Sequence, residues 1–249
     1  MERIKLQQLN DHIFSMDDAG EAVGYLVVGE KKALVIDTMN GYEDVKAVAR
    51  SVTDLPLMVV NTHGHCDHIY GNIYFEEAYL HPLDMELARQ HSGFDGFVKR
   101  MKERGLCMPP FRPIAHGDVI DLGGLTLEVV HLPGHTQGSI LLLLREDRVL
   151  FTGDAINTHL WMQLEDSSSL PDFLQALDKV MYLKEQADYI LHGHYGQFLP
   201  ISLMERLREG VSELCRGETG DDQDYQFFGG PARQHLYDGG KALIVYPKK

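Results

Sequence analysis

The sequence predicts a fold that mixes short buried strands with amphipathic helices, and three observations support this. The chain has 249 residues, of which 44% are hydrophobic and 24% charged, as in one large globular domain. Short apolar runs rich in valine, leucine and isoleucine recur between glycine and proline residues, which is typical of buried strands. Other segments repeat apolar residues at helical spacing. We therefore expect a single domain over residues 1–249, without internal repeats or a clear boundary.

The first quarter of the chain predicts two strands, a helix and a third strand. Residues 22–29 and 31–37 form a hairpin that turns at a Gly-Glu pair. Residues 42–52 place valine and alanine at helical spacing, so this segment is expected to be an amphipathic helix. Residues 57–61 are then a strand, and this strand leads into the polar segment 62–68.

The segment from about residue 81 to 113 has a different character. It holds two short helical stretches, at 82–91 and 95–105, and ends in a proline-rich run. We interpret it as a helical insertion or lid rather than as part of a sheet. The remaining elements are, in chain order, a hairpin over 118–131, strands over 139–144 and 148–151, a helix starting at Ser169, a strand over 188–191, a helix over 203–214 ended by Gly217, a polar surface loop over 218–234 and a strand over 242–246.

An excess of acidic residues limits the partners that the protein can bind. The formal net charge is −14, from 37 acidic and 23 basic residues, which disfavours nucleic acid because its recognition usually needs a basic surface. The three cysteines show no paired spacing, and the N-terminal residues carry no long apolar run of the kind that directs secretion. No apolar run approaches the ~20 residues that cross a bilayer. We expect a cytoplasmic protein without a membrane partner.

Residues 62–68 read Thr-His-Gly-His-Cys-Asp-His and are the most informative stretch of the chain. Imidazole and carboxylate groups are the ligands that zinc and similar divalent metals prefer. A tight loop that leaves a strand can direct alternate side chains to one point. His63 and His65 can therefore share one ion, while Asp67 and His68 turn toward a second.

Three later segments repeat this design, in which an apolar run ends in a potential ligand. Residues 129–135 end in Pro-Gly-His, residues 149–154 end in Gly-Asp, and residues 189–194 end in His-Gly-His. Together with residues 62–68 they supply seven potential ligands at four strand ends. A metal site explains this pattern better than chance polar loops do.

These motifs resemble those of the metallo-β-lactamase fold superfamily over roughly residues 12–200. The His-x-His-x-Asp-His signature and the downstream Pro-Gly-His-Thr, Gly-Asp and Gly-His elements match, in order, His63, His65, Asp67, His68, His135, Asp154 and His194. The resemblance implies an α+β fold, namely a four-layer αββα sandwich. In this fold two sheets pack face to face, helices cover their outer sides, and the metals lie at one rim.

The resemblance also implies a role for each of the seven residues. The first metal would be held by His63, His65 and His135, the second by Asp67, His68 and His194, and Asp154 would bridge them. His192 competes with His194, but the motif places the ligand directly after the glycine. Zinc is the first choice for five imidazoles and two carboxylates, and manganese and iron are alternatives. Asp37 either orients a ligand or stabilises a turn, and His131 is expected to pack nearby. Cys66 is expected to point away from the metals.

Two divalent ions sharing a carboxylate indicate a hydrolase. A hydroxide that bridges the ions would attack a small ester, lactone or thioester, and Asp67 would carry the proton to the leaving group. The sequence contains no Gly-x-Ser-x-Gly motif for a serine nucleophile. Three alternatives stay open: an iron-dependent persulfide dioxygenase, a phosphodiesterase or nuclease, and a metal-binding relative without catalytic activity.

The wall of the substrate site is expected to come from residues 81–113 and 155–168. Its apolar mouth would include Phe111, His159, Trp161 and Met162, with Trp161 either facing substrate or packed on the sheet. Tyr195 is interpreted as a packed residue rather than as a donor to a developing oxyanion. Surface or packing positions are assigned to His12, His81, His91, His116, His159 and His235.

Overall fold

The computed structural model describes residues 3–227 and 230–248, and their strands form three sheets. Sheet 1 has seven strands in sequential order: β1 (Ile4–Gln8), β2 (Ile13–Asp18), β3 (Val23–Val28), β4 (Ala33–Ile36), β5 (Leu57–Val60), β6 (Ala78–Leu80) and β7 (Phe111–Pro113). Sheet 2 has the order β14 (Tyr195–Pro200), β13 (Tyr189–His192), β11 (Val149–Gly153), β10 (Ile140–Leu144), β9 (Thr126–His131) and β8 (Val119–Asp121). Sheet 3 has the order β12 (His159–Trp161), β17 (Ala242–Pro247), β16 (Gly230–Tyr237) and β15 (Gln223–Phe227).

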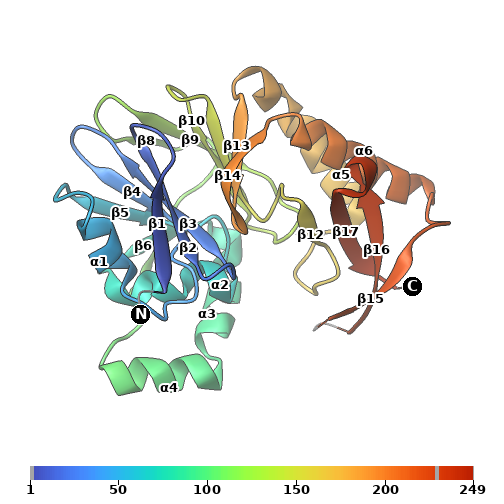
Figure 1. Ribbon diagram of the computed structural model, residues 1–249. Helices are drawn as coiled ribbons and strands as arrows, with labels where there is room; N and C mark the ends of the chain where they lie inside the picture. Colours follow the sequence, from blue (N-terminus) through green and yellow to red (C-terminus); the bar gives the residue numbers. More distant parts are fainter. Residues whose placement is uncertain (1–2, 228–229, 249) are drawn as a thin grey trace.

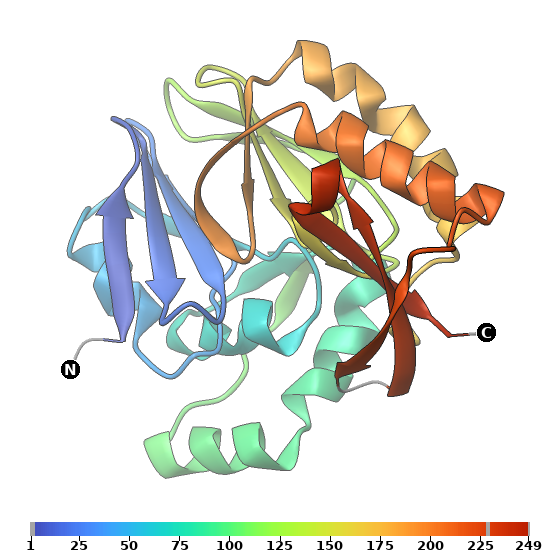
Figure 2. The same ribbon diagram turned by 45° about the vertical axis from the view of Figure 1, so that its right-hand side comes forward.

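Helices pack on the outer sides of the sheets or extend away from them. They are α1 (Val45–Arg50), α2 (Cys66–Ile69), α3 (Met85–Ser92), α4 (Asp95–Arg104), α5 (Leu170–Val180) and α6 (Leu203–Arg216), with short 3₁₀ turns at Tyr70–Tyr74, Pro82–Asp84, Met181–Glu185 and Asp238–Gly240. Figure 1 shows α1 outside sheet 1 and the pair α5 and α6 outside sheet 2, while α4 lies away from the sheets. Figure 2 shows the same layers after a turn of the molecule, with sheet 3 next to α6.

The central strands are apolar throughout because both of their faces are buried. In β4, Leu34 and Ile36 belong to the core between sheets 1 and 2, whereas Ala33 and Val35 pack toward α1 on the outer side. The same division occurs in β10, where alternate leucines face sheet 1 or the cluster that includes α5 and α6. Successive side chains of a strand point to opposite faces, so a strand that is apolar throughout packs against one layer on each face. This packing produces the layered sandwich.

The α+β sandwich predicted from the sequence is confirmed, and most of its elements lie where the sequence places them. The hairpin β3–β4, the helices α1, α3, α4, α5 and α6, and the strands β5, β8 to β11, β13 and β17 agree with expectation. Helix α5 begins at Ser169, whose hydroxyl accepts the backbone N–H of Asp172, and α6 ends at Gly217 with a φ of 80°.

Two expectations about loops are wrong. The expected surface loop over 218–234 contains the antiparallel strands β15 and β16, while residues 228–229 lie outside the described residues. These strands were missed because one of their faces is largely polar and their apolar pattern is weak. Residues 111–113, expected to lie outside any sheet, form the edge strand β7, where a proline is tolerated. The single domain over residues 1–249, with an insertion at about 81–113, stays a prediction.

Parallel pairing brings the ends of several strands to one rim. The pairs β4–β5 in sheet 1 and β11–β13 in sheet 2 are parallel, so the loops that follow each pair emerge on the same side. The segments 62–68, 154–158 and 193–194 follow β5, β11 and β13, respectively. Within residues 3–227 and 230–248, no helix has both the length and the apolar character needed to cross a membrane.

Candidate metal centre

Three imidazoles from two sheets converge at the rim. The Nδ1 atom of His65 lies 3.1 Å from Nε2 of His63 and 2.9 Å from Nε2 of His135. All three side chains are buried. Their potential ligand atoms lie within 4.8 Å of one another, so one cation can contact all three. This group is the predicted first position.

A second group lies beside the first. Oδ2 of Asp67 lies 3.7 Å from Nε2 of His68 and 3.6 Å from Nε2 of His194. The carboxylate of Asp154 reaches both groups, because Oδ2 lies 2.9 Å from Nε2 of His194 and 3.7 Å from Nε2 of His135. The structure thus brings all seven predicted residues together, with Asp154 between the two groups.

The outer nitrogen of each imidazole faces an oxygen atom. These pairs are His63 Nδ1 with Thr62 Oγ1 (3.1 Å), His65 Nε2 with Asp166 Oδ2 (2.7 Å), His68 Nδ1 with Asp37 Oδ2 (2.9 Å), His135 Nδ1 with the Trp161 carbonyl (2.8 Å) and His194 Nδ1 with the Glu21 carbonyl (2.9 Å). Carbonyl and carboxylate oxygens only accept, so the outer nitrogens carry the protons. The Thr62 hydroxyl donates to Asp37, so it too accepts from His63. The inward nitrogens of neutral rings then keep their lone pairs, as metal binding requires.

Two buried polar atoms in the centre lie 3.6 Å apart and have no hydrogen-bond partner among the described residues. They are Nε2 of His68 and Oδ1 of Asp154. Such atoms are costly to bury without a partner, and a cation between them would supply one. Burial by itself would raise the pKa of Asp154, but the neighbouring His194 and His68 hold that pKa well below its usual value. The donor set and its charge therefore fit divalent metal ions.

The first motif is shaped by its glycine and by a short helix. His65 has extended backbone and precedes α2, so His63 and His65 alternate along the loop while Asp67 and His68 lie in the first helical turn. A Cβ at Gly64 would lie 2.9 Å from the carbonyl oxygen of Asp84. This loop therefore requires glycine between the two histidines.

The last motif also depends on its glycine. A Cβ at Gly193 would lie 2.5 Å from Oδ1 of Asp154 and 2.5 Å from Cε1 of His68. His192 is buried and belongs to none of the possible ligand groups; its Nδ1 accepts the backbone N–H of His194 at 3.2 Å. The geometry therefore favours His194 over His192 as a ligand.

Other residues singled out in the sequence take supporting positions. Asp37 accepts from the backbone N–H and the hydroxyl of Thr62 as well as from His68. His131 stacks on the ring of His81, with centroids 4.2 Å apart. Burial raises the pKa of the Cys66 thiol to about 11, and Cys66 belongs to none of the possible ligand groups.

The predicted apolar mouth of the site is wrong in part. Met162 is buried in the cluster that includes α5 and α6, and Phe111 packs against clusters on the outer side of sheet 1. Tyr195 is 47% exposed and so is not the packed residue that was expected. The ring of Trp161 lies 6.0 Å from that of His159, and its carbonyl contacts His135.

Three supporting residues carried no signal in the sequence. Asp166 accepts from His65, and the ring of His91 stacks on the ring of His65 at a centroid distance of 5.3 Å. Asp84 accepts the backbone N–H groups of Gly64 and Gly138, joining the first motif to the loop that carries His135. Their partners are distant in the sequence, so no local spacing could have identified them.

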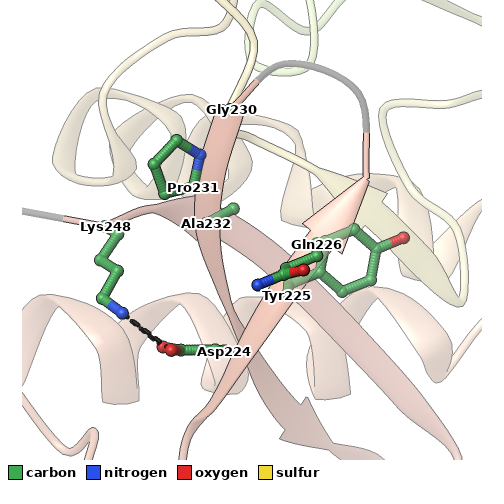
Figure 3. Close-up of a pocket in the computed structure, with 7 residues that line it drawn as sticks. All are labelled: Asp224, Tyr225, Gln226, Gly230, Pro231, Ala232 and Lys248. Carbon is green, nitrogen blue, oxygen red and sulfur yellow. Dashed lines mark hydrogen bonds and ion pairs between the residues drawn. The ribbon is translucent and has the colours of Figure 1, made fainter.

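A hollow lies apart from the seven residues, at the β15–β16 hairpin (Figure 3). It has a volume of about 360 Å³, and its lining includes Tyr225, Gln226, Pro231 and the ion pair between Lys248 and Asp224. The described residues that line it include none of the seven potential ligands. The hydroxyl of Tyr225 forms a hydrogen bond of 3.0 Å with Nε2 of His159 in β12.

Comparisons with known proteins agree with this geometry. Residues 18–194 match the family model of the metallo-beta-lactamase superfamily. The chain is 30% identical over 200 residues to acyl-coenzyme A thioesterase MBLAC2 of Gallus gallus. The aligned region covers 70% of this chain and 72% of that protein. It is 27% identical over 194 residues to an atrochrysone carboxyl ACP thioesterase of Passalora fulva, covering 74% of this chain and 52% of that protein.

Solved structures show the same fold. A metallo-beta-lactamase from Erythrobacter litoralis superimposes with a TM-score of 0.63 at 21% identity, covering 86% of this chain and 98% of that chain. The metallo-beta-lactamase DIM-1 superimposes with a TM-score of 0.64 at 16% identity, covering 86% of this chain and 99% of that chain. At these identities the likeness concerns the fold alone. The family match over most of the chain and the agreement in fold lead to one conclusion: the chain belongs to the metallo-beta-lactamase superfamily.

Proposed function

We propose that this protein is a metal-dependent hydrolase that cleaves acyl thioesters. The observation that carries the proposal is the convergence of seven ligand-type side chains, with the outer nitrogen of each imidazole facing an oxygen atom. The relatives named as thioesterases act on acyl-coenzyme A or on an acyl carrier protein substrate, which favours a thioester over an ester or lactone. Those names also give no support to persulfide oxidation or to phosphodiester cleavage.

The proposed cofactor is a pair of divalent ions, with zinc as the first choice because imidazole and carboxylate ligands suit it. His63, His65 and His135 would hold one ion, Asp67, His68 and His194 the other, and Asp154 both. When bound, the ions would lower the pKa of a water molecule between them, so that hydroxide is available at neutral pH, and would polarise the substrate carbonyl.

Asp67 is the residue that we assign to proton transfer. Its side chain is 30% exposed beside His68 and His194, so it is both close to the centre and open to solvent. Burial by itself would raise its pKa, but these two imidazoles lower the pKa below its usual value. The carboxylate is therefore ready to accept the proton of the attacking water. As the acyl carbon–sulfur bond breaks, that proton passes to the leaving sulfur, giving a carboxylic acid and a thiol.

The proposed substrate is a small molecule, and the excess of acidic residues argues against nucleic acid. The three cysteines form no disulfide. Free thiols are usual in a reducing compartment, which supports our proposal of a cytoplasmic enzyme.

The test uses apo protein reconstituted separately with zinc, manganese or iron. Release of thiol from acyl-coenzyme A of several chain lengths is compared with turnover of esters, lactones and phosphodiesters. We expect thioester hydrolysis that depends on added metal. The variants His63→Ala and Asp154→Ala should have no such activity. His116→Ala, which changes an exposed histidine, is the control and should keep full activity. Unchanged turnover in His63→Ala would refute the proposal. In metal-loaded Asp67→Asn, an unchanged kcat would refute the proton-transfer role.

A further inference from the structure

The segment Trp161–Ser168 contacts two imidazoles of the first group. Oδ2 of Asp166 accepts from Nε2 of His65 at 2.7 Å, and the carbonyl of Trp161 accepts from Nδ1 of His135 at 2.8 Å. The hydroxyl of Ser167 donates to the carbonyl of His135 at 2.9 Å. A single connecting segment therefore orients two of the three rings of the first position.

The second group is supported from elsewhere in the molecule. His68 donates to Asp37, which follows β4, and His194 donates to the carbonyl of Glu21, which precedes β3. Both supports lie in loops next to strands of sheet 1, whereas the segment Trp161–Ser168 begins at the last residue of β12 in sheet 3 and leads to α5. The two groups share Asp154, and Thr62 links His63 to Asp37. The outer supports of His65 and His135, by contrast, are separate from those of His68 and His194.

The segment is itself held by the C-terminal strand. In sheet 3, β12 pairs in parallel with β17, with Trp161 opposite Val245, and the N–H of Met162 donates to the carbonyl of Val245 at 2.7 Å. Figure 1 shows β12 and β17 side by side. Strand β17 lies beyond residues 18–194, the part of the chain that matches the family model. The first group is therefore supported by a sheet whose strands β15, β16 and β17 lie outside the matched region, whereas β12 lies within it.

Asp166 is suited to hold the ring of His65. Its side chain is 28% exposed, and its backbone carbonyl accepts from the side-chain amide of Gln137. A carboxylate that accepts from the outer nitrogen keeps the proton there, leaves the lone pair of Nδ1 directed inward and strengthens it as a ligand. Without this carboxylate, the ring of His65 is free to change tautomer or to rotate.

We propose that Asp166 is a positioning residue that holds His65 as a ligand of the first metal position, and that the segment Trp161–Ser168 sets the metal affinity of this position separately from the second. The inference rests on the proposed metal-dependent function. Removing such a support typically costs about 10–100-fold in metal affinity. The loss of metal affinity should therefore occur in the binding step of the first position and not in that of the second.

The experiment is a titration of full-length apo protein with zinc. A second titration uses cobalt(II), because the absorption of the bound cobalt ion reports each binding step. Wild type is compared with Asp166→Ala and Asp166→Asn, and His135→Ala identifies the step that belongs to the first position. Asp172→Ala is the matched control, since this exposed carboxylate lies in the first turn of α5 and contacts no ligand. Circular dichroism and thermal unfolding of each apo protein check the fold.

We expect Asp166→Ala to weaken the first-position step by about 10–100-fold and to leave the other step unchanged, with a smaller loss in Asp166→Asn. In wild-type apo protein, long-range ¹H–¹⁵N spectra should show the proton of His65 on Nε2, and Asp166→Ala should lose this single form. Two normal steps in Asp166→Ala, or an equal loss in both steps, would overturn the inference. A wild type that binds no metal would instead refute the proposed function.

Discussion

The Nδ1 atom of His68 lies 2.9 Å from Oδ2 of Asp37, and both side chains are buried. Asp37 also accepts two hydrogen bonds from Thr62, and its backbone φ is 59°. A residue other than glycine in this conformation costs about 1–3 kcal/mol, and the surrounding contacts must offset that cost. Asp37 therefore joins the end of β4 to the metal-binding loop and orients His68, which combines the two roles that the sequence left open.

Asp37→Asn should weaken metal binding at the second position by about 10–100-fold. The loss at the first position should be smaller, because Asp37 reaches His63 only through the Thr62 hydroxyl. Asparagine tolerates a positive φ, so the backbone is preserved, but one accepting oxygen is lost. The measurement is the two-step cobalt titration of apo protein, with thermal unfolding as a check on the fold. A loss confined to the first position would contradict this assignment.

Gly193→Ala should destabilise the protein by about 1–3 kcal/mol and reduce binding at the second position. The added methyl group would lie 2.5 Å from both Asp154 and His68, so one of these groups must move. Gly96→Ala is the control, because a Cβ there meets nothing within 4 Å and alanine favours helix α4. Chemical unfolding and metal stoichiometry are measured for both variants. Equal behaviour of the two would show that the close approach does not matter.

The two metal positions should differ in their dependence on pH. Burial lowers the pKa of His135 to about 4, and the neighbouring His65 contributes to this shift. Burial would also lower the pKa of His194, but Asp154 beside it raises this pKa to about 9. A metal entering the second position must therefore displace a proton at neutral pH.

Burial alone would also lower the pKa of His68, but the nearby carboxylates of Asp154, Asp67 and Asp37 raise this pKa well above its usual value. We expect affinity at the second position to rise with pH by about tenfold per pH unit for each proton that the metal displaces, and to level off above the pKa values of the two histidines at this position. Affinity at the first position should change little over the same range, since His135 is already neutral. Isothermal titration calorimetry in buffers of different protonation enthalpy measures the number of protons released in each metal-binding step. Equal proton release at the two positions would count against this account.

His235 should make the stability of the protein fall at alkaline pH. Its ring connects sheet 3 to α6, with Nδ1 2.8 Å from Asp222 and Nε2 3.0 Å from Glu213. Burial would lower its pKa, but the two carboxylates raise the pKa above its usual 6.5. The stabilisation is fully present below that value and is lost as pH rises through the higher folded-state pKa.

The check is thermal unfolding of wild type and His235→Gln from neutral to alkaline pH. The decrease in melting temperature should be smaller in His235→Gln, with His116→Gln as an exposed control that behaves like wild type. A decrease of the same size in wild type and His235→Gln would exclude this ion pair as the cause.

Much of the fold could be predicted because each layer of the sandwich leaves a local pattern. Strand β10 is apolar at every position, and α5 combines a capping serine with a regular apolar stripe. Strands β15 and β16 carry mostly polar residues, and this composition predicts a loop. The two strands pair with each other, and β16 also pairs with the more apolar β17 that follows it in the chain.

The seven ligand-type side chains and the strand ends that carry them can be identified from the chain alone, because each motif lies within a few residues of a buried apolar run. Which oxygen faces each outer imidazole nitrogen depends instead on how the chain folds. His65 and Asp166 are 101 residues apart, and His194 and Glu21 are 173 apart. Such partners meet only because two sheets pack face to face and a third sheet holds the connecting segment, and packing over these separations leaves no spacing to read along the chain.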